Sequence, residues 1–481
     1  MRNKILNLCL ILSIGLIFSC KKDKDPEPEP IPTPIPTIEE NKQKVESTGI
    51  QLVGTMREMK DLQATAHVDN FTNYLDIASP SNGSKSATRN NSAIKLLYNI
   101  KSFSNNKLSL IDLFTSMKGN SDRAVNADSS SIQFQFDDVK GVYEWNPDSS
   151  DWDYTATGNY IVFKFPSTNT GTINNSTVTI SYTGINGVTL PLGIDEEYSY
   201  DVPGNVTMDF SVDGVSYISY DLTVTYNADG FPATIASTLT IAPFSFAVNV
   251  NYSTTNVGVT YTFKKNSQII LQYGADVTGN FAVSDFENLM VEDSSYTIDY
   301  YGDTIWDYWT DADPDLIDNV FHNAHAFVQI FDIKLDGTLN TAALANAIKT
   351  IDDNNQNGTI TDDQATEQAV AAVNTNLNLN LKNVTTGDLI ANLKAYTFQE
   401  TNNYTDWVWN DVTQQYDEIP VTETYTEVGF KFFFPDGSSV DADTYFNDGF
   451  GDLVNQINDF IDDLNTDYDL GAEHIDYPLT K

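Results

Sequence analysis

The fold is decided by residues 206–226, which read VTMDFSVDGVSYISYDLTVTY. Apolar and polar residues alternate through this stretch, which is the two-residue period of a strand with one buried face. Asp213-Gly214 interrupts the alternation, and this dipeptide favours the type I′ turn of a two-residue hairpin. The stretch therefore predicts two long antiparallel strands.

The same alternation continues on both sides of this hairpin, from residue 204 to residue 278, with polar turns at 227–230 and 264–267. It begins near residue 131 and returns over 404–434. The predicted strands are often near ten residues long, against a usual five or six. Their apolar face and their Thr, Ser and Asp face indicate an antiparallel sheet that is covered on one side.

Three regions carry the three- to four-residue spacing of apolar residues that is typical of helices. These regions are 39 to about 118, 311–395, and a terminal stretch that begins near Phe450. The sequence therefore predicts an α+β fold, in which a large, long-stranded antiparallel β-sheet packs with N-terminal, central and C-terminal helices. We expect the sheet and its first helices over 39–310, and a second part over 311–481.

The chain begins with a basic segment, Met1 to Lys4, followed by an apolar run over 5–18. This order is that of an export signal. The run ends in Ile17-Phe18-Ser19-Cys20, which resembles the lipobox of bacterial lipoproteins. The resemblance implies that residues 1–19 are removed, that Cys20 carries a diacylglycerol (hence palmitate-type acyl chains), and that its new amino group is acylated. An ordinary signal peptide or an uncleaved anchor helix is the alternative.

Residues 20–38 are expected to be a tether. Proline occupies every second position over 26–36, which excludes a helix and favours an extended polyproline II arm of about 30–40 Å. The charged residues 21–25 resemble the surface-export signals of Bacteroidota-type lipoproteins. The resemblance implies an outer-membrane lipid anchor and a body on the periplasmic or cell-surface face.

The composition excludes several classes of partner and site. The net charge of −41 would be repelled by nucleic acid phosphates and by anionic headgroups. The chain has two cysteines, and Cys9 lies in the signal that would be removed. The mature chain would then have neither an intramolecular disulfide nor a free thiol for catalysis.

Residues 353–364, DNNQNGTITDDQ, resemble the calcium loop of an EF-hand. Oxygen-bearing side chains occupy alternate positions, and Gly358 stands where the family makes its sharp turn. The resemblance implies a weak Ca²⁺ site with these ligands: Asp353, Asn355, Asn357, Thr359 and Gln364. Gln364 stands where the family has a bidentate Glu, so we expect an affinity of only about 10⁻⁴–10⁻³ M. A polar Asn/Gly turn between two helices is the alternative.

Calorimetry tests this calcium site. Calcium at millimolar concentration should give a heat of binding and a rise in the thermal midpoint, and both should diminish in Asp353→Ala. The absence of both effects, together with no loss in the variant, would rule the site out.

A second group of metal-binding residue types is Asp315, Asp318, His322 and His325. On a helix these residues would form one polar stripe, which could hold zinc. The alternative is the wet face of an amphipathic helix. No HExxH motif is present.

Aromatic residues beside acids suit the apolar faces and hydroxyl edges of sugar rings. Such clusters occur at Trp306, Tyr308 and Trp309, and again at Trp407 and Trp409. Core and hairpin packing is the alternative. Trp145-Asn146 with Trp152-Asp153, and Trp409-Asn410 with Tyr416-Asp417, also indicate a faint internal repeat of aromatic hairpins.

No sequence motif identifies a catalytic residue, and no carboxylate pair can be selected among 67 acids. We therefore expect a membrane-anchored, non-catalytic binding or scaffold protein with a glycan or protein ligand. A carrier that holds an apolar, lipid-like molecule between sheet and helices is the alternative, and a polysaccharide hydrolase ranks third.

Overall fold

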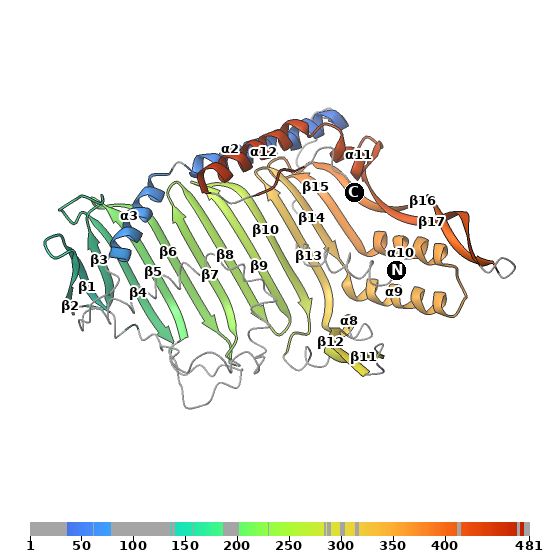
Figure 1. Cartoon of the computed structure of the whole chain (residues 1–481), viewed down its shortest axis with the longest axis horizontal. Helices are drawn as coiled ribbons and strands as arrows, with labels where there is room; N and C mark the ends of the chain where they lie inside the picture. Colours follow the sequence, from blue (N-terminus) through green and yellow to red (C-terminus); the bar gives the residue numbers. More distant parts are fainter. Residues whose placement is uncertain are drawn as a thin grey trace, which may run out of the picture. The chain divides into compact units, whose positions relative to one another are not determined.

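The computed structural model describes residues 36–60, 62–77, 136, 140–156, 158–185, 202–228, 230–282, 285, 290–298, 304–312, 317–410, 415–468 and 472–475 (Figure 1). The predicted signal, the predicted lipidation site Cys20 and residues 20–35 of the predicted tether lie outside these ranges, as does the stretch 78–118 of the first helical region. The chain divides into two compact units. Unit 1 comprises 1–56, 253–260 and 269–481, and unit 2 comprises 57–252 and 261–268.

Among the described residues, sixteen strands form one sheet in the order β18-β17-β16-β15-β14-β13-β10-β9-β8-β7-β6-β5-β4-β3-β1-β2. The first ten are β1 (Gly141–Asn146), β2 (Asp151–Thr155), β3 (Tyr160–Phe165), β4 (Ser176–Ile185), β5 (Val202–Val212), β6 (Val215–Tyr226), β7 (Pro232–Ile241), β8 (Phe244–Ser253), β9 (Asn256–Lys265) and β10 (Gln268–Gly279). The other six are β13 (Phe321–Ile330), β14 (Ile333–Leu339), β15 (Leu377–Asn383), β16 (Leu389–Asn410), β17 (Gln415–Phe433) and β18 (Ser439–Asp441).

A second sheet pairs β11 (Met290–Ile298) with β12 (Thr304–Ala312). The helices are α2 (Ile38–Lys60), α3 (Gln63–Ile77), α8 (Ile317–Val320), α9 (Thr341–Gln356), α10 (Asp362–Asn376), α11 (Ala442–Asn447) and α12 (Gly451–Tyr468). The α+β fold class is therefore confirmed.

The hairpin that the sequence predicts at Asp213-Gly214 is present. β5 and β6 pair antiparallel, with Val212 opposite Val215. Asp213 and Gly214 have φ values of 51° and 78°, as a type I′ turn requires at both central positions. The prediction of long strands over 204–278 is confirmed, since β5 to β10 are ten to twelve residues long.

The prediction of a continuous helical region over 311–395 is wrong. Residues 321–330 form β13, which pairs with both β10 and β14. The spacing of apolar residues there also fits a helix, but backbone hydrogen bonds from two neighbouring strands override this local pattern. β14, β15 and the start of β16 are further strands inside the region, and only α8, α9 and α10 are helical.

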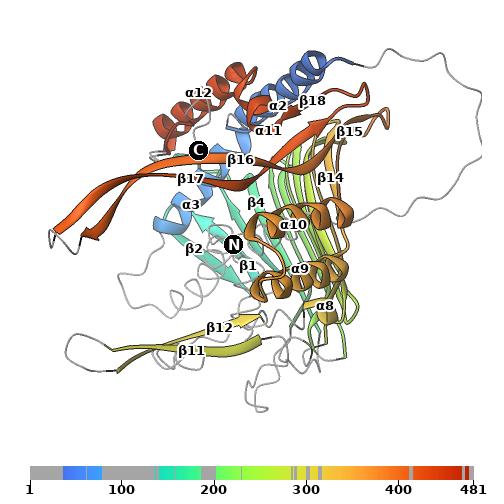
Figure 2. The same ribbon diagram turned by 90° about the vertical axis from the view of Figure 1, so that its right-hand side faces the viewer.

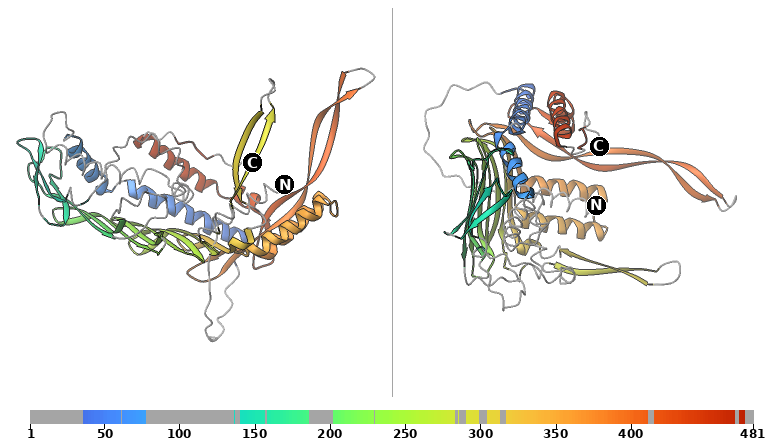
Figure 3. Two further views of the ribbon diagram at one scale, coloured as in Figure 1. Left: turned by 90° about the horizontal axis from the view of Figure 1, so that it is seen from below. Right: turned by 60° about the vertical axis from the view of Figure 1, so that its left-hand side comes forward.

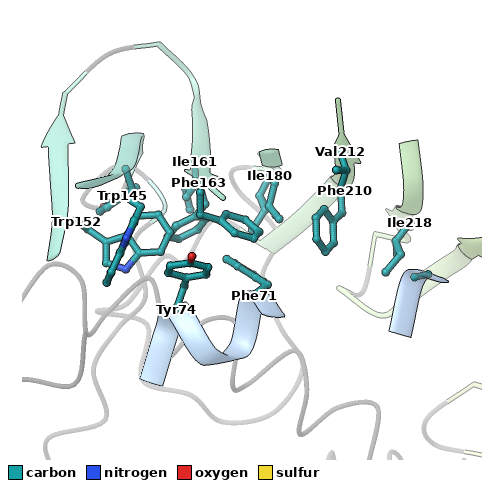
Figure 4. Packing of buried hydrophobic residues seen from close by; sticks show 14 residues of the cluster. Phe71, Tyr74, Trp145, Trp152, Ile161, Phe163, Ile180, Phe210, Val212 and Ile218 are labelled. Atoms are coloured by element: carbon teal, nitrogen blue, oxygen red, sulfur yellow. The ribbon is translucent and has the colours of Figure 1, made fainter. Parts of the chain in front are cut away.

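In unit 2, helix α3 covers one face of the strands from β1 to β6 (Figure 4). Phe71 stacks on Phe165 with ring centroids 4.7 Å apart, and Tyr74 meets Trp145 edge to face at 4.9 Å. The Tyr74 hydroxyl donates to the Thr168 carbonyl at 2.7 Å. The helix is therefore held by ring packing and by a hydrogen bond that satisfies its buried hydroxyl.

In unit 1, the N-terminal helix packs against the C-terminal helices. Thr37 and Glu40 form a capping box that starts α2 directly after Pro36. A Cβ on Gly49 would meet Leu453 of α12 at 2.7 Å, so the glycine permits a close helix–helix approach. Figure 1 shows α2 and α12 side by side.

Helices α9 and α10 form an antiparallel pair that covers the apolar face of β13 to β15. Leu344 of α9 packs against Ala324 and Leu339, and Ile351 of α9 packs against Ala365 of α10. This helix pair matters for function because it supports the base of the two longest strands, β16 and β17.

Candidate functional site

Strands β16 and β17 form a two-stranded ribbon that projects beyond the rest of unit 1 (Figure 2). They pair with each other from Asn392–Phe433 to Asn410–Gln415. By contrast, β15 pairs with β16 only over 389–393, and β18 pairs with β17 only over 431–433. We call the ribbon formed by 394–410 and 415–430 the arm.

Helix α10 fixes the base of the arm. The Asn374 side chain donates to the Ala395 carbonyl at 2.8 Å and accepts the Ala395 N–H at 3.0 Å. The Asp363 carboxylate accepts the Thr426 N–H at 3.1 Å and the Thr426 hydroxyl at 2.6 Å. Asn374 and Asp363 therefore bond the backbone groups that a neighbouring strand would otherwise bond. Residues of β16 beyond Thr401 extend into solvent.

One face of the distal arm is aromatic. Trp407, Trp409 and Tyr416 lie on this face, because side chains alternate along a strand and Tyr416 pairs with Trp409. Their exposed fractions are 59%, 48% and 60%. Trp409 and Tyr416 meet edge to face at 5.1 Å, and Glu418 stands directly opposite Trp407. We call Trp407, Trp409, Tyr416 and Glu418 the aromatic face.

The opposite face of the arm is also exposed and mixes apolar with acidic residues. Tyr404 and Ile419 are about two-fifths exposed, at 42% and 43%, and Ile419 stands opposite Asp406. Closer to the base, partial desolvation and the nearby carboxylates, first Glu400, raise the pKa of Tyr425. The arm therefore carries a negative field along its length.

Each edge of the distal arm has a position that hinders the addition of a further strand. The Ala395 N–H points away from β17, so every second N–H along β16, including that of Trp407, does the same. The Asp406 carboxylate accepts the Trp407 N–H at 2.8 Å. On β17, the outward position opposite Thr405 is Pro420, which has no N–H. Capped and proline-blocked edges protect a ribbon against strand addition, so the arm offers its faces.

The β1–β2 hairpin in unit 2 has the same cross-strand plan with the opposite burial. Trp145 stands opposite Trp152 and meets it edge to face at 5.5 Å. Both rings are buried, and Tyr74 of α3 packs on Trp145. The corresponding Trp409–Tyr416 pair is exposed. The likeness agrees with the internal repeat that the sequence suggests, and the relatedness of the two hairpins stays a prediction.

The other aromatic cluster singled out in the sequence, at Trp306, Tyr308 and Trp309, lies on β12 of the separate two-stranded sheet (Figure 3). By register, Trp306 stands opposite Tyr296 and Trp309 opposite Asp293. The two clusters of aromatic residues therefore belong to two different ribbons and do not share one strand pair.

The EF-hand-like loop lies between α9 and α10. Asp353 and Asn355 are in the last turn of α9, and Gly358 has φ of 69°. The Asn355 amide donates to Asp362 at 3.0 Å. The Gln364 side-chain oxygen accepts the Thr361 N–H at 3.1 Å in a capping box that starts α10. A helix thus stands on each side of the loop, although α9 extends to Gln356 and includes the first four positions of the predicted loop. Calcium binding by Asp353, Asn355, Asn357, Thr359 and Gln364 stays a prediction.

The predicted helical stripe of Asp315, Asp318, His322 and His325 does not form. Asp315 lies outside the described residues, Asp318 is in the short helix α8, and both histidines are in β13. Three residues apart on a strand, His322 and His325 point to opposite faces. The expected stripe required a helix, and the pairing of β13 with two strands excludes one.

His325 instead joins a charge cluster on β13, β14 and β15. Its Nε2 lies 3.2 Å from the Asp336 carboxylate, and both residues are buried. Lys334 Nζ lies 2.8 Å from Asp336, and the Lys382 ammonium donates to the second carboxylate oxygen. Lys334 also lies over the Phe327 ring, 4.0 Å from its centroid.

The surroundings set the protonation states of this cluster. Burial alone would raise the pKa of Asp336, but hydrogen bonds from Lys334 and Lys382 lower it overall. Burial, opposed in part by Asp336 and aided by the two lysines, lowers the pKa of His325 to about 3. His325 is therefore neutral at pH 7 and donates Nε2–H to an ionised carboxylate, which can only accept.

Asp276 of β10, directly opposite His325, behaves differently. Burial raises its pKa to about 7. Its contribution to folding is largest below its unfolded pKa near 4 and is lost as the pH rises through 7. Among the described residues, no group of three or more His, Cys, Asp and Glu side chains is placed to hold a metal ion. The cluster is therefore best described as a buried ion network within the sheet.

Stability should depend on the protonation of His325. In the unfolded chain His325 binds a proton as the pH falls through about 6.5, whereas in the folded chain its pKa is about 3. This contribution is therefore present above pH 6.5 and is lost as the pH falls, by about 2 kcal/mol at pH 5. His325→Gln, which keeps an N–H donor for Asp336, should show a shallower fall in unfolding free energy between pH 7 and pH 5.

Denaturant unfolding at several pH values measures this difference. The region above pH 7 is the internal control, because His325 is neutral there in both the folded and the unfolded chain. Parallel curves for the variant and the natural chain down to pH 5 would show that His325 is not the group that titrates.

Within the described residues, no helix is long and apolar enough to cross a membrane. Comparison of the chain with protein-family models, with curated proteins and with solved structures finds no match.

Proposed function

We propose that this protein is a lipid-anchored, exported, non-catalytic binding protein, and that the arm is its ligand-binding surface. The single observation that carries the proposal is the aromatic face, on which three large aromatic residues are 48–60% exposed at the end of a supported ribbon. Aromatic rings that stay exposed together are typical of recognition surfaces, because their burial by a partner supplies much of the binding energy.

The arm does not serve to stabilise the folded chain. A two-stranded ribbon alone is marginally stable in water, and exposed Trp407 and Trp409 contribute little burial to it. In the β1–β2 hairpin a comparable aromatic pair is covered by α3. On the arm, the rings stay 48–60% exposed among the described residues, and a ligand that covers them fits this role.

The ligand class that follows from the aromatic face is a glycan or a polypeptide. Sugar rings offer C–H faces to stack on Trp407 and Trp409, and hydroxyls for Glu418 and the neighbouring Thr and Asn side chains. Side chains of a protein partner can bury the same rings. Nucleic acid is disfavoured because the chain carries a net charge of −41.

The two other functions have less support. For an apolar-ligand carrier, one natural location is the interface between α3 and the sheet of unit 2, and this space is filled by ring-on-ring packing around Phe71 and Phe165 (Figure 4). For a polysaccharide hydrolase, Asp276 and Asp336 have pKa values shifted in opposite directions, as acid–base pairs do. Asp336, however, is buried and bonded to two lysines.

The anchor is part of the proposal and rests on the lipobox resemblance at Cys20. The tether would join the lipid to Thr37, where α2 begins. A weak Ca²⁺ site at 353–364 would lie in the α9–α10 pair, whose α10 supports the arm. This arrangement gives an outer-membrane protein whose binding arm is held away from the bilayer on the periplasmic or cell-surface side.

Metabolic labelling tests the anchor. Cells that express the natural chain with an alkyne palmitate should incorporate label into the protein and retain it in the membrane fraction. Cys20→Ser should lose the label and enter the soluble fraction, because Cys20 is the sole cysteine that remains after residue 19. Equal labelling of both chains would contradict lipidation at this residue.

Ligand screening tests the arm. Glycan and peptide arrays should give ligands whose affinity falls by at least about tenfold in the double variant Trp407→Ala/Trp409→Ala. Tyr160→Ala is the matched control, since Tyr160 is a 52% exposed aromatic on β3, and it should bind as the natural chain does. Ligands that bind the double variant unchanged would place the binding surface elsewhere.

A further inference from the structure

We infer that the aromatic face recognises a lysine- or arginine-bearing segment of a partner polypeptide, with its cation held between the Trp407 ring and the Glu418 carboxylate. This inference rests on the proposed function of the arm and specifies the class of its ligand. It follows from the charge of the arm, from the way this protein holds its own lysines, and from the hindered edges of the ribbon.

The charge of the arm selects a cation. Between Lys394 and Lys431 the chain has seven acidic residues and neither lysine nor arginine. A second copy of this chain, an anionic glycan or an acidic surface would be repelled, whereas a basic segment would be attracted and steered to the arm. By register, Glu418 is the one described acid on the aromatic face, and the other five lie on the opposite face: Glu400, Asp406, Asp417, Glu423 and Glu427. The wider field therefore attracts a basic segment to the arm, and Glu418 is the carboxylate that the segment meets beside the rings.

Two places in unit 1 show how this protein holds a lysine. At the base of the arm, Lys431 Nζ lies 3.9 Å from the centroid of the Tyr396 ring and 3.9 Å from the Asp441 carboxylate. On β13 and β14, Lys334 lies over the Phe327 ring and contacts Asp336. In both places one ammonium lies between an aromatic face and a carboxylate, which is a favourable cation–π arrangement.

The distal arm has a comparable ring and carboxylate, those of Trp407 and Glu418, but no lysine at the corresponding position. Phe327 stands directly opposite Asp336 across β13 and β14, and Lys334 comes two residues before Asp336. Trp407 stands directly opposite Glu418 in the same antiparallel manner, but the residue two positions before Glu418 is Tyr416. Within the described part of the arm no lysine or arginine stands in this place, and a cation from a partner would complete the arrangement.

The ligand is recognised by its side chains and not by strand addition. The Trp407 N–H is taken by Asp406, and Pro420, opposite Thr405, blocks the outer edge of β17 two residues closer to the base. Trp407 and Trp409 are two residues apart on one strand, which separates them by about 7 Å. An extended polypeptide with basic residues at every second position has the same repeat, so it can place one cation on each ring.

The test uses the full chain and two synthetic peptides. One peptide alternates lysine and serine over about ten residues, and the other is the same peptide with every lysine acetylated. Binding is followed by calorimetry and by tryptophan fluorescence at about 50 mM salt. The lysine peptide should bind and the acetylated peptide should not, because acetylation removes the charge and the cation–π contact. Added salt should weaken binding.

Three variants separate cation–π recognition from simple contact. Trp407→Leu keeps an apolar side chain but removes the ring, and should lower affinity about two- to fivefold. Glu418→Gln keeps the shape and removes the charge, and should lower affinity by a similar factor. Glu367→Gln, an exposed acid on α10, is the matched control and should leave affinity unchanged. Circular dichroism verifies that each variant keeps its strand content.

The outcomes separate this inference from the proposed function. If Glu367→Gln weakens the lysine peptide as much as Glu418→Gln, the binding is nonspecific charge attraction and the inference is overturned. If a neutral oligosaccharide binds in a Trp407-dependent manner and the lysine peptide does not, the arm is the site but its ligand is a glycan. If spermine competes as strongly as the peptide, a free polyamine replaces the polypeptide. If no ligand depends on Trp407, both proposals fail.

Discussion

Antiparallel backbone pairing between consecutive strands is the interaction on which this structure depends. Where a strand has neighbours on both sides, as β13 has, its N–H and C=O groups are satisfied and its side chains divide between two faces. Where the neighbours end, the chain must satisfy the same groups in other ways. β16 and β17 outlast β15 and β18 by many residues, and the arm exists because they pair with each other.

The arm shows three substitutes for a missing neighbour strand. Asn374 bonds both backbone groups of Ala395, Asp363 takes the Thr426 N–H, and Asp406 takes the Trp407 N–H. Pro420 removes a donor outright. With the edges hindered in this way, the free surface of the ribbon is its side chains, and the rings of the aromatic face dominate it. The location of recognition on the face thus follows from the backbone constraint.

The spacing of apolar residues predicted a helix or strand correctly where the face that it marks as apolar is also the face that the folded chain buries. The alternation around Asp213-Gly214 gave the correct hairpin because one sheet face is buried there, and the terminal amphipathic stretch predicted α12. The spacing of Phe321, Ala324 and Phe327 fits a helix, whereas the alternation of Ala324, Ala326 and Val328 fits a strand. Pairing with β14, the next strand along the chain, and with β10, which is separated from β13 by β11, β12 and α8, decided between them. The Thr361-x-x-Gln364 capping box was readable from the sequence and would have assigned Gln364 to the start of α10.

Only part of the candidate site could be predicted from the sequence. Trp407 and Trp409 could be singled out, but neither their exposure nor the partnership of Trp407 with Glu418 follows from spacing, because both depend on the register of the hairpin. The identical cross-strand plan at Trp145 and Trp152 is buried beneath α3. Whether an aromatic hairpin becomes core or a binding surface is thus determined by whether a helix covers it, and that is a property of the whole fold.

Hydrogen–deuterium exchange across the arm is the most direct measurement of its role. Residues 401–409 and 415–424 should exchange rapidly in the free protein, since the ribbon has solvent on both faces and no strand beside it. Addition of the lysine peptide, or of an oligosaccharide found by screening, should slow exchange in these two segments while β5 to β8 stay unchanged. Slowed exchange at another part of the chain, with the arm unaffected by every bound ligand, would contradict its assignment as the binding surface.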